Sequence, residues 1–236
     1  MAEHRPATIT IDWNRVEQQL DERGYARIPR LLKASDCRNL AALYDVDPRF
    51  RSTVDMERHG YGQGQYRYFA NPLPRLVSNL RRSLYKPLSR IANHWNERLG
   101  QRKRFPSSLS QFQKLCDKAG QTRPTPLLLH YEAGGYNRLH QDNYGQIAFP
   151  LQVTCLLSRP ELDFTGGEFL LLEQQPRMQS RGEVIHLQRG EAIVFPNQNR
   201  PVHGRKRETR CTVKHGVSPV RSGSRKALGL IFHDAR

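Results

Sequence analysis

The feature that most constrains the fold of this chain is a change of pattern at Pro126. After it, short runs of β-branched and large apolar residues follow one another closely, separated by glycine turns such as Gly134-Gly135 and Gly166-Gly167. Many short strands joined by turn residues are typical of a β-sandwich or barrel, and not of alternating βαβ units. The runs that we expect to form strands are 127–131, 147–157, 167–172, 184–187, 192–195, 211–217 and 227–232.

The residues before Pro126 show helical periodicity instead, because apolar side chains recur there every three or four positions. Pro87 is expected to kink or split the longest helix, since proline lacks the backbone N–H. The segment GYGQGQYRYF at 60–69 is interpreted as an aromatic loop, because no strand precedes it as a phosphate-binding GxGxxG loop would require. Helices are expected at 13–23, from a cap at Ser35 or Asp36 onward, at 73–99 and at 107–118, with a short strand at 25–29.

These patterns together predict an α+β chain with three parts. Residues 1–12 form a mobile polar segment, and residues 13–126 form a mainly helical support. Residues 127–236 form a double-stranded β-helix, the jelly-roll architecture that cupins share.

The cysteines and the apolar runs exclude several classes of protein. Cys37, Cys116, Cys155 and Cys211 lie far apart with no CxxC pair, so neither a disulfide scaffold nor a cysteine zinc site is expected. No run approaches the ~18 apolar residues of a membrane span, and the first residues lack the pattern of a signal peptide. We therefore expect a reduced, cytoplasmic protein with no membrane partner.

His140 and Asp142 form the first candidate for a metal site. On an extended segment, residues i and i+2 point to the same face, so an imidazole and a carboxylate would reach one metal ion. A later histidine would complete a facial triad of two histidines and one carboxylate, which leaves positions open for a cosubstrate and oxygen. The candidates for this third ligand are His186, His203 and His215.

The surroundings of these histidines favour His215. His203 lies in a basic segment typical of a solvated loop, and nothing near His186 supports a role as a ligand. His215 alternates with apolar residues, and it is followed ten residues later by Arg225, which shares a strand face with the small residues Ala227 and Gly229. Because an arginine fork binds a carboxylate bidentately, this pair fits an iron ligand and an anchor for 2-oxoglutarate.

Four motifs in order resemble those of the prolyl-4-hydroxylase-type Fe(II)/2-oxoglutarate dioxygenases over roughly residues 127–233. They are His140-x-Asp142, Thr165-Gly-Gly-Glu-Phe169, Arg189-Gly-Glu-Ala-Ile-Val-Phe195 and His215-Gly-Val-x-Pro-Val-x-x-Gly-x-Arg225. The N-terminal half is similar to a bacterial subfamily of 2-oxoglutarate/Fe(II) oxygenases.

The resemblance implies a set of roles for individual residues. It implies iron at His140, Asp142 and His215, with Arg225 on the distal carboxylate of 2-oxoglutarate. Tyr131 falls near the position of a tyrosine that also touches the cosubstrate in related enzymes, and a plain core tyrosine is the competing interpretation. The implied reaction hydroxylates a substrate C–H bond with O2 and releases succinate and CO2, with ascorbate as a reductant of inactive iron.

Three interpretations of the substrate remain open. The resemblance favours a protein or amino-acid side chain. The charge favours oxidation of a nucleic acid, because 38 Lys and Arg against 22 Asp and Glu give a net charge of +16. A cupin-like module that binds metal without catalysis is the third. The nucleic-acid hypothesis rests on the clusters Arg81-Arg82, Arg102-Lys103-Arg104 and Arg205-Lys206-Arg207, and on Tyr61, Tyr66, Tyr68 and Phe69 as stacking surfaces.

Overall fold

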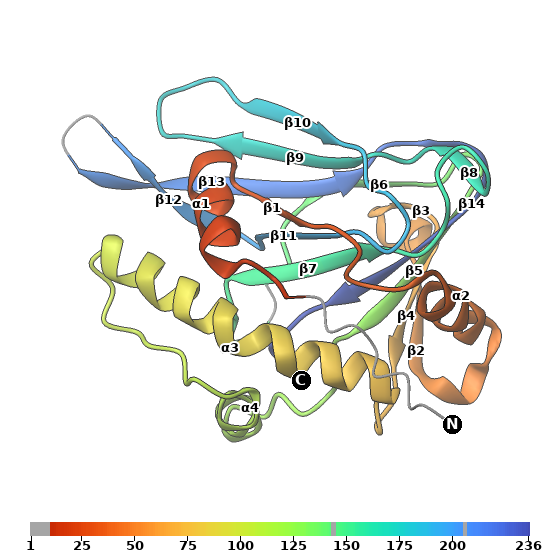
Figure 1. The fold of residues 1–236 in the computed structure, drawn as a ribbon, viewed down its shortest axis with the longest axis horizontal. Helices are drawn as coiled ribbons and strands as arrows, with labels where there is room; N and C mark the ends of the chain where they lie inside the picture. Colours follow the sequence, from red (N-terminus) through yellow and green to blue (C-terminus); the bar gives the residue numbers. More distant parts are fainter. Residues whose placement is uncertain (1–9, 143–144, 205–206) are drawn as a thin grey trace.

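Two antiparallel sheets packed face to face form the centre of the computed structural model, which describes residues 10–142, 145–204 and 207–236 (Figure 1). The helices are α1 (Trp13–Arg23), α2 (Ala34–Ala42), α3 (Arg75–Arg98) and α4 (Leu109–Lys118). The strands are β1 (Ala26–Ile28), β2 (Phe50–Asp55), β3 (Gly62–Gln63), β4 (Gln65–Phe69), β5 (Leu127–Glu132), β6 (Tyr136–His140), β7 (Leu151–Leu156), β8 (Phe164–Gly166), β9 (Phe169–Gln174), β10 (Arg181–Ile185), β11 (Ala192–Pro196), β12 (Asn199–His203), β13 (Glu208–Val217) and β14 (Val220–Leu230).

The larger sheet has the order β1-β11-β7-β14-β5-β4-β2, with β8 paired to the start of β14. The smaller sheet has the order β10-β9-β13-β6-β3, with β12 paired to β13. In Figure 1 the smaller sheet covers one face of the larger sheet, while α3 and α4 lie against the other face. This is the α+β sandwich that the sequence predicts.

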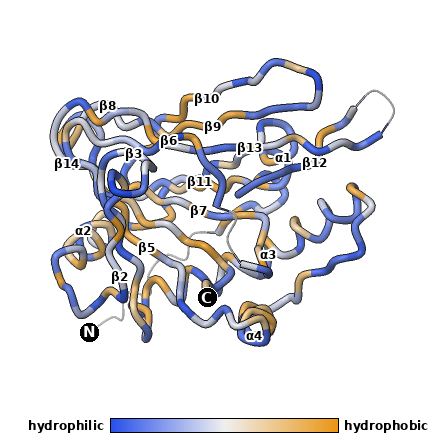
Figure 2. The backbone as a smooth tube through the Cα atoms, turned by 180° about the vertical axis from the view of Figure 1, so that it is seen from behind, coloured by the Kyte–Doolittle hydropathy of each residue, from blue (hydrophilic) through white to orange (hydrophobic). Residues whose placement is uncertain are grey.

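The alternation of side chains along β7 separates two apolar cores. Leu151, Val153 and Cys155 pack with residues of the helices, whereas Leu156 packs between the two sheets. Figure 2 shows hydrophobic stretches along β5 and β7 at the centre of this arrangement. The helices therefore fix the outer face of the larger sheet and leave its inner face for the site described below.

The predicted helices are present, with two differences in detail. Helix α3 runs through Pro87 without being split, because Leu84, Leu88 and their neighbours are buried against the sheet and outweigh one lost hydrogen bond. Helix α2 begins at Ala34 without a side-chain cap, so the predicted cap at Ser35 or Asp36 is wrong and both residues lie in its first turn.

The prediction of a loop at 60–69 is also wrong. This segment forms β3 and β4, and β4 pairs with both β5 and β2. Gly64 has a φ of +135°, and a Cβ there would lie 2.8 Å from the ring of Tyr131. The glycines therefore allow the two strands to pass close to neighbouring residues. They are also typical of loops, so the strand alternation of Tyr66 and Tyr68 was not recognised in the sequence.

The predicted division of the chain stays a prediction. Strands β1 to β4 come from the region 13–126 and join the two sheets, which extend across the proposed boundary at residue 126. The predicted mobile segment 1–12 falls mostly on residues 1–9, which lie outside the described residues. Within the described residues, none of the helices has the length and apolar character needed to cross a membrane.

Candidate active site

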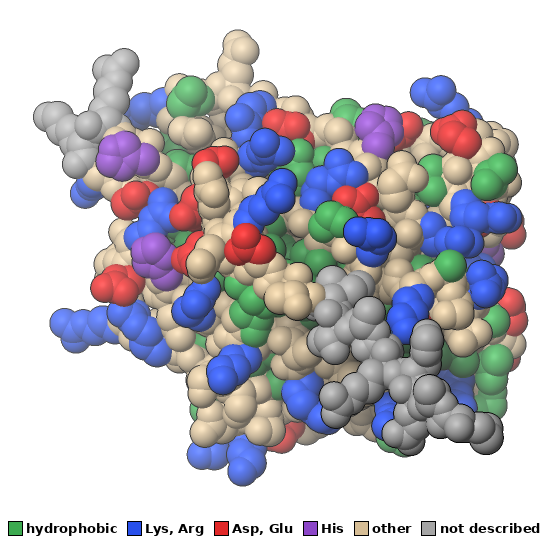
Figure 3. Space-filling view, viewed as in Figure 1, with side chains coloured by type: hydrophobic (Ala, Val, Ile, Leu, Met, Phe, Trp, Pro, Cys, Tyr) green, Lys and Arg blue, Asp and Glu red, His purple; other side chains and the backbone are tan. Residues whose placement is uncertain are grey.

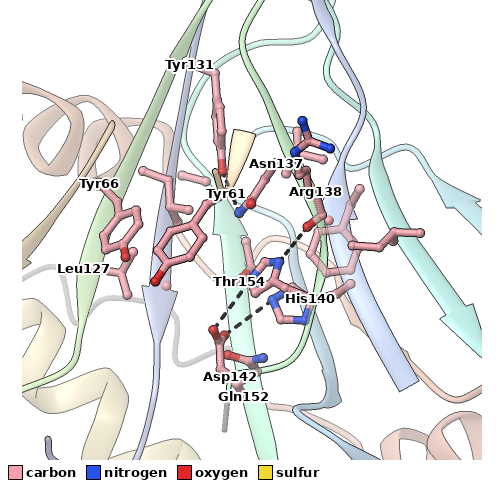
Figure 4. Close-up of a pocket in the computed structure, with 18 of the residues that line it drawn as sticks. Tyr61, Tyr66, Leu127, Tyr131, Asn137, Arg138, His140, Asp142, Gln152 and Thr154 are labelled. Atoms are coloured by element: carbon pink, nitrogen blue, oxygen red, sulfur yellow. Dashed lines mark hydrogen bonds and ion pairs between the residues drawn. The ribbon is translucent and has the colours of Figure 1, made fainter. Parts of the chain in front are cut away.

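Three predicted metal ligands meet between the two sheets. His140 ends β6 and is paired in register with His215 on β13, and Asp142 follows two residues after His140. The Nε2 atom of His140 lies 3.5 Å from Oδ1 of Asp142, and the Nε2 atom of His215 lies 3.4 Å from Oδ2 (Figure 4). The structure therefore brings together the residues that the sequence placed 75 positions apart.

Neighbouring groups hold each member of this triad in place. His140 Nδ1 lies 2.7 Å from the backbone oxygen of Arg138, so an Nδ1–H donating there leaves Nε2 facing Asp142. The segment that carries Asp142 is tied to the sheets by Gln141, whose Nε2 donates to the Val213 carbonyl at 2.9 Å. The ring of Phe195 packs 4.8 Å from that of His215.

The electrostatics of the triad favour an anionic carboxylate beside two imidazoles. Burial opposes ionisation of Asp142, but hydrogen bonds from His140 and His215 hold the pKa of its carboxyl well below its usual range. Burial lowers the pKa of His215. Burial also opposes protonation of His140, yet Asp142 beside it raises the pKa of His140 overall.

The donor set of this triad fits Fe(II). One ligand atom from each of His140, Asp142 and His215 lies within 4.8 Å of the others. Two imidazole nitrogens and one carboxylate oxygen with open positions beside them are the donors preferred by non-haem iron. The His140 and Asp142 side chains are 34% and 21% exposed, so these donors face open space rather than a sealed core.

The competing histidines lie elsewhere. His203 is 83% exposed in its side chain and lies 3.6 Å from Glu208 at the end of β12. His186 is exposed just after β10. Neither of them lines the cavity that contains the triad, as the sequence predicts.

A cavity of about 570 Å³ extends from the triad across the inner face of the larger sheet. Arg225, Ala227, Gly229 and Ile231 all line it from β14 and its end, which confirms the alternation predicted for this strand. The small side chains of Ala227 and Gly229 leave open space between Arg225 and the opposite end of the cavity.

Arg225 is a buried cation that forms no ion pair with a carboxylate of the described residues. It is 2% exposed, and its Nε has no hydrogen-bond partner among the described residues. Its guanidinium carbon lies 5.7 Å from the ring centre of Tyr131 and 5.9 Å from that of Phe164. Burial lowers the pKa of this guanidinium, and an entering carboxylate would satisfy it.

Gly167 supplies the room that Arg225 occupies. A Cβ at Gly167 would lie 2.8 Å from Cδ of Arg225 and 2.9 Å from Cγ2 of Val220. Its φ of +62° is also one that glycine adopts without strain. The glycine pair after Thr165 thus bends the chain at β8 and also packs directly on the arginine.

Tyr131 satisfies both interpretations offered for it. Its side chain is fully buried, as a core tyrosine would be, yet it also lines the cavity beside Arg225. Its hydroxyl accepts a hydrogen bond from Asn137 Nδ2 at 3.4 Å. Burial raises the pKa of Tyr131 to about 12, so its hydroxyl remains a neutral donor.

The residues assigned to nucleic-acid binding fall into different groups. Tyr61, Tyr66 and Tyr68 line the cavity, but Phe69 is fully buried in the core. Arg81 is 1% exposed and pairs with Asp234 at 2.6 Å, so its assignment to a nucleic-acid surface is wrong. Arg205 and Lys206 lie outside the described residues.

Sequence reasoning missed a second group of cavity residues on β7. Gln152 and Thr154 line the cavity from the inner face of this strand. The alternation Leu151, Val153, Cys155 was a usable signal, because it leaves the polar residues between them on the opposite face. It was hidden by an apolar run that continues on both sides.

Comparison with known proteins assigns the chain to a family. Residues 64–235 match the family model Oxygenase-NA, which is described as "Oxygenase, catalysing oxidative methylation of damaged DNA". Two uncharacterized proteins from strains of Mycobacterium tuberculosis, CDC 1551 / Oshkosh and H37Rv, are each 48% identical to this chain over 167 residues, which is 71% of this chain and 72% of theirs.

Solved structures confirm the double-stranded β-helix. A Pseudomonas putida prolyl-4-hydroxylase has 15% identity and a TM-score of 0.53 over 95% of this chain and 99% of its own. A 2-oxoglutarate/Fe(II) oxygenase-family oxidoreductase of Burkholderia pseudomallei has 18% identity and a TM-score of 0.54 over 94% and 92%. A Trichoplax adhaerens prolyl hydroxylase, in complex with a hypoxia inducible factor peptide fragment, has 19% identity and a TM-score of 0.55 over 94% and 89%.

These matches confirm the predicted class of oxidoreductase. The chain is an oxygenase that belongs to the Oxygenase-NA family and has the fold of the 2-oxoglutarate/Fe(II) oxygenases.

Proposed function

We propose that this enzyme binds Fe(II) through His140, Asp142 and His215, and binds the distal carboxylate of 2-oxoglutarate through Arg225. The observation that carries the proposal is the pairing of these two features in one cavity. A donor set suited to iron and a buried arginine with an unpartnered Nε face the same open space. Neither feature has a structural explanation within the described chain.

Each residue has a defined task in this proposal. Bound iron supplies the chemistry by which O2 and 2-oxoglutarate hydroxylate a C–H bond, with succinate and CO2 released. Arg225 holds one end of the cosubstrate, and the neutral Tyr131 hydroxyl beside it donates a second hydrogen bond. The fixed tautomer of His140 keeps Nε2 available as a ligand. Ascorbate as a reductant and a cytoplasmic location remain expectations.

For the substrate we propose an alkylated base of a nucleic acid rather than a protein side chain. The family description names damaged DNA, and the net charge of +16 would attract a polyanion. On the face seen in Figure 3, Lys and Arg side chains are spread broadly with Asp and Glu among them. Tyr61 and Tyr66 give the cavity an aromatic wall. A nucleobase stacks on such rings, whereas an aliphatic side chain does not.

Two measurements on the same samples test this proposal. Purified protein with Fe(II), 2-oxoglutarate and O2 is given a single-stranded oligodeoxynucleotide that contains one 3-methylcytosine. Hydroxylation of the N-methyl group would release it as formaldehyde, so we expect formaldehyde and succinate in equal amounts. The unmethylated oligonucleotide should yield no formaldehyde.

The alternatives predict different results. If succinate formation rises with proline-containing peptides but not with the methylated oligonucleotide, the substrate is a protein side chain. No succinate under any condition, from folded protein loaded with iron, would support a non-catalytic module and refute the proposed activity. Binding of the oligonucleotide should also weaken with salt, with log K falling by ~0.9 or less per phosphate contact per unit of log salt.

A further inference from the structure

Gln152 is a buried polar side chain that the proposed roles leave unexplained. It lies on β7, is 5% exposed, and lines the cavity of the triad. Its Nε2 has no hydrogen-bond partner among the described residues. Since a buried donor without an acceptor is unfavourable, such a group is best explained by a ligand that supplies the acceptor.

The position of Gln152 places it close to the metal ligands. It pairs in register with Phe195 on β11, whose ring packs 4.8 Å from His215. Asn197, just after β11, donates its backbone N–H to Pro150 and its side-chain Nδ2 to the backbone oxygen of Asp142. The start of β7 is thus linked to both sides of the triad, and Figure 4 shows Gln152 at the same end of the cavity as Asp142.

Gln152 also lies too far from Arg225 to contact the distal carboxylate of 2-oxoglutarate. Leu230 pairs with Val153, so Gln152 is level with Ile231, which is six residues along the chain from Arg225. Six residues of strand span ~20 Å. The Arg225 guanidinium is held near Phe164, toward β8 and away from Gln152. A five-carbon dicarboxylate spans only ~5 Å between its end carbons, so the carboxylate group that Arg225 holds lies far from Gln152.

The wall of the cavity that faces the triad is aromatic. In Figure 4, Tyr61 and Tyr66 stand on one side of the cavity and the triad on the other. Tyr61 is 50% exposed, and its ring is stacked on that of His59 at 5.3 Å with an interplanar angle of 22°. Tyr66 is held edge to face with Tyr68 at 5.4 Å. These two rings line the same cavity as the metal ligands.

We propose that Gln152 is a specificity-determining residue that donates a hydrogen bond to the edge of a nucleobase whose ring lies against the Tyr61–Tyr66 wall. The inference rests on the proposed function and names how that substrate is recognised. A carbonyl oxygen or a ring nitrogen on the base supplies the acceptor that Gln152 lacks. A flat aromatic face and a single buried donor together match a base better than either feature does alone.

The test compares two ligands on two variants. One single-stranded oligodeoxynucleotide carries one 3-methylcytosine, and the other has an abasic site at the same position. Binding is followed by fluorescence anisotropy under anaerobic conditions, with Fe(II) and 2-oxoglutarate present. Gln152→Met removes the donors at similar volume, and Gln152→Glu is the second variant in case the first does not fold. Gln18→Met, in an exposed position on α1, is the matched control.

We expect Gln152→Met to weaken binding of the methylated oligonucleotide about five- to tenfold and to leave binding of the abasic oligonucleotide unchanged. An equal loss with both ligands would contradict the proposal, because it would show a general disturbance of the fold. Unchanged binding of both would also overturn it. In that last case, formaldehyde release by the wild-type enzyme would still show that the proposed function holds without this role for Gln152.

Discussion

Two buried arginines in different regions of the molecule have opposite surroundings. Arg81, on α3, donates to the backbone oxygens of Ile231 and Phe232 at 3.0 and 2.7 Å, and pairs with Asp234 at 2.6 Å. Arg225, on β14, is equally buried, but its Nε has no partner and no carboxylate in the described part of the chain forms an ion pair with it.

This contrast distinguishes an arginine that stabilises the fold from one whose partner is not part of it. In the sequence, Arg81 stands in the basic pair Arg81-Arg82, whereas Arg225 follows His215 by ten residues and shares a strand face with small residues. A buried charge is unfavourable unless it is paired and hydrogen-bonded. Arg81 meets this condition within the chain, so it joins α3 to the C-terminal segment. Arg225 does not meet it, so its partner is expected to come from outside the chain.

The largest effect is expected from a matched pair of histidine variants, which extends the comparison to the metal ligands. His215→Ala should abolish iron-dependent succinate formation, because it removes one of three donors. His203→Ala should retain most of it, since that side chain is exposed outside the cavity. Metal content after gel filtration and succinate yield would check both. The reverse result would identify His203, in the β12–β13 hairpin, as the third ligand.

The next largest effect concerns Arg81. Arg81→Met should lower the free energy of unfolding by about 3–5 kcal/mol, because it leaves the buried Asp234 carboxylate without its cation. Urea denaturation followed by circular dichroism measures this loss. Arg82→Met, at the exposed neighbouring position, should stay within about 0.5 kcal/mol of the wild type. A loss below 1 kcal/mol for Arg81→Met would show that the pair is not structural.

Arg225→Met should show the opposite pattern. Its affinity for 2-oxoglutarate should fall at least ~10-fold, since loss of a charge-assisted contact costs on the order of 1.5–3 kcal/mol. Its free energy of unfolding should not fall as that of Arg81→Met does, because the Nε of Arg225 has no hydrogen-bond partner among the described residues and no carboxylate there is left without its cation. Equilibrium binding of 2-oxoglutarate checks the first point and urea denaturation the second. Unchanged affinity would remove Arg225 from the site.

The smallest effect tests the space around Arg225. Gly167→Ala combines a strained φ of +62° with a contact to the arginine side chain, so it should weaken 2-oxoglutarate binding several-fold besides costing about 1–2 kcal/mol of stability. Gly100→Ala has a similar φ of +66° with nothing within 4 Å of the added carbon. It should show the loss of stability alone. Equal affinities of the two variants for 2-oxoglutarate would mean that the contact of the added carbon with Arg225 does not affect binding.

The parts of the site that were predictable from the sequence lie on regular strands. Alternation placed His215 among buried residues of β13 and Arg225 in line with Ala227 and Gly229. The spacing of His140 and Asp142 worked for the same reason, since a strand ends at His140. Side chains alternate between the two faces of a sheet along each strand, and these assignments required only that alternation.

The other parts depend on the pairing of distant segments. The partner of Arg81 lies 153 residues away, and nothing local distinguishes it from a surface cation. The place of Gln152 in the cavity depends on the register of β7 with β14, which sets it apart from Arg225. In the segment 60–69, glycines that permit close passage of strands were interpreted as loop residues. Register and close approach are set by tertiary packing, which local patterns do not carry.

The most direct test of the central claim is an anaerobic titration of the protein with Fe(II) and then with 2-oxoglutarate, followed by visible absorption. We predict a charge-transfer band of the iron–2-oxoglutarate chelate at one equivalent of iron. The band should be absent in His215→Ala and should need at least ~10-fold more 2-oxoglutarate in Arg225→Met. Absence of the band in folded wild-type protein that has bound iron would contradict the assignment of this cavity as the site of 2-oxoglutarate.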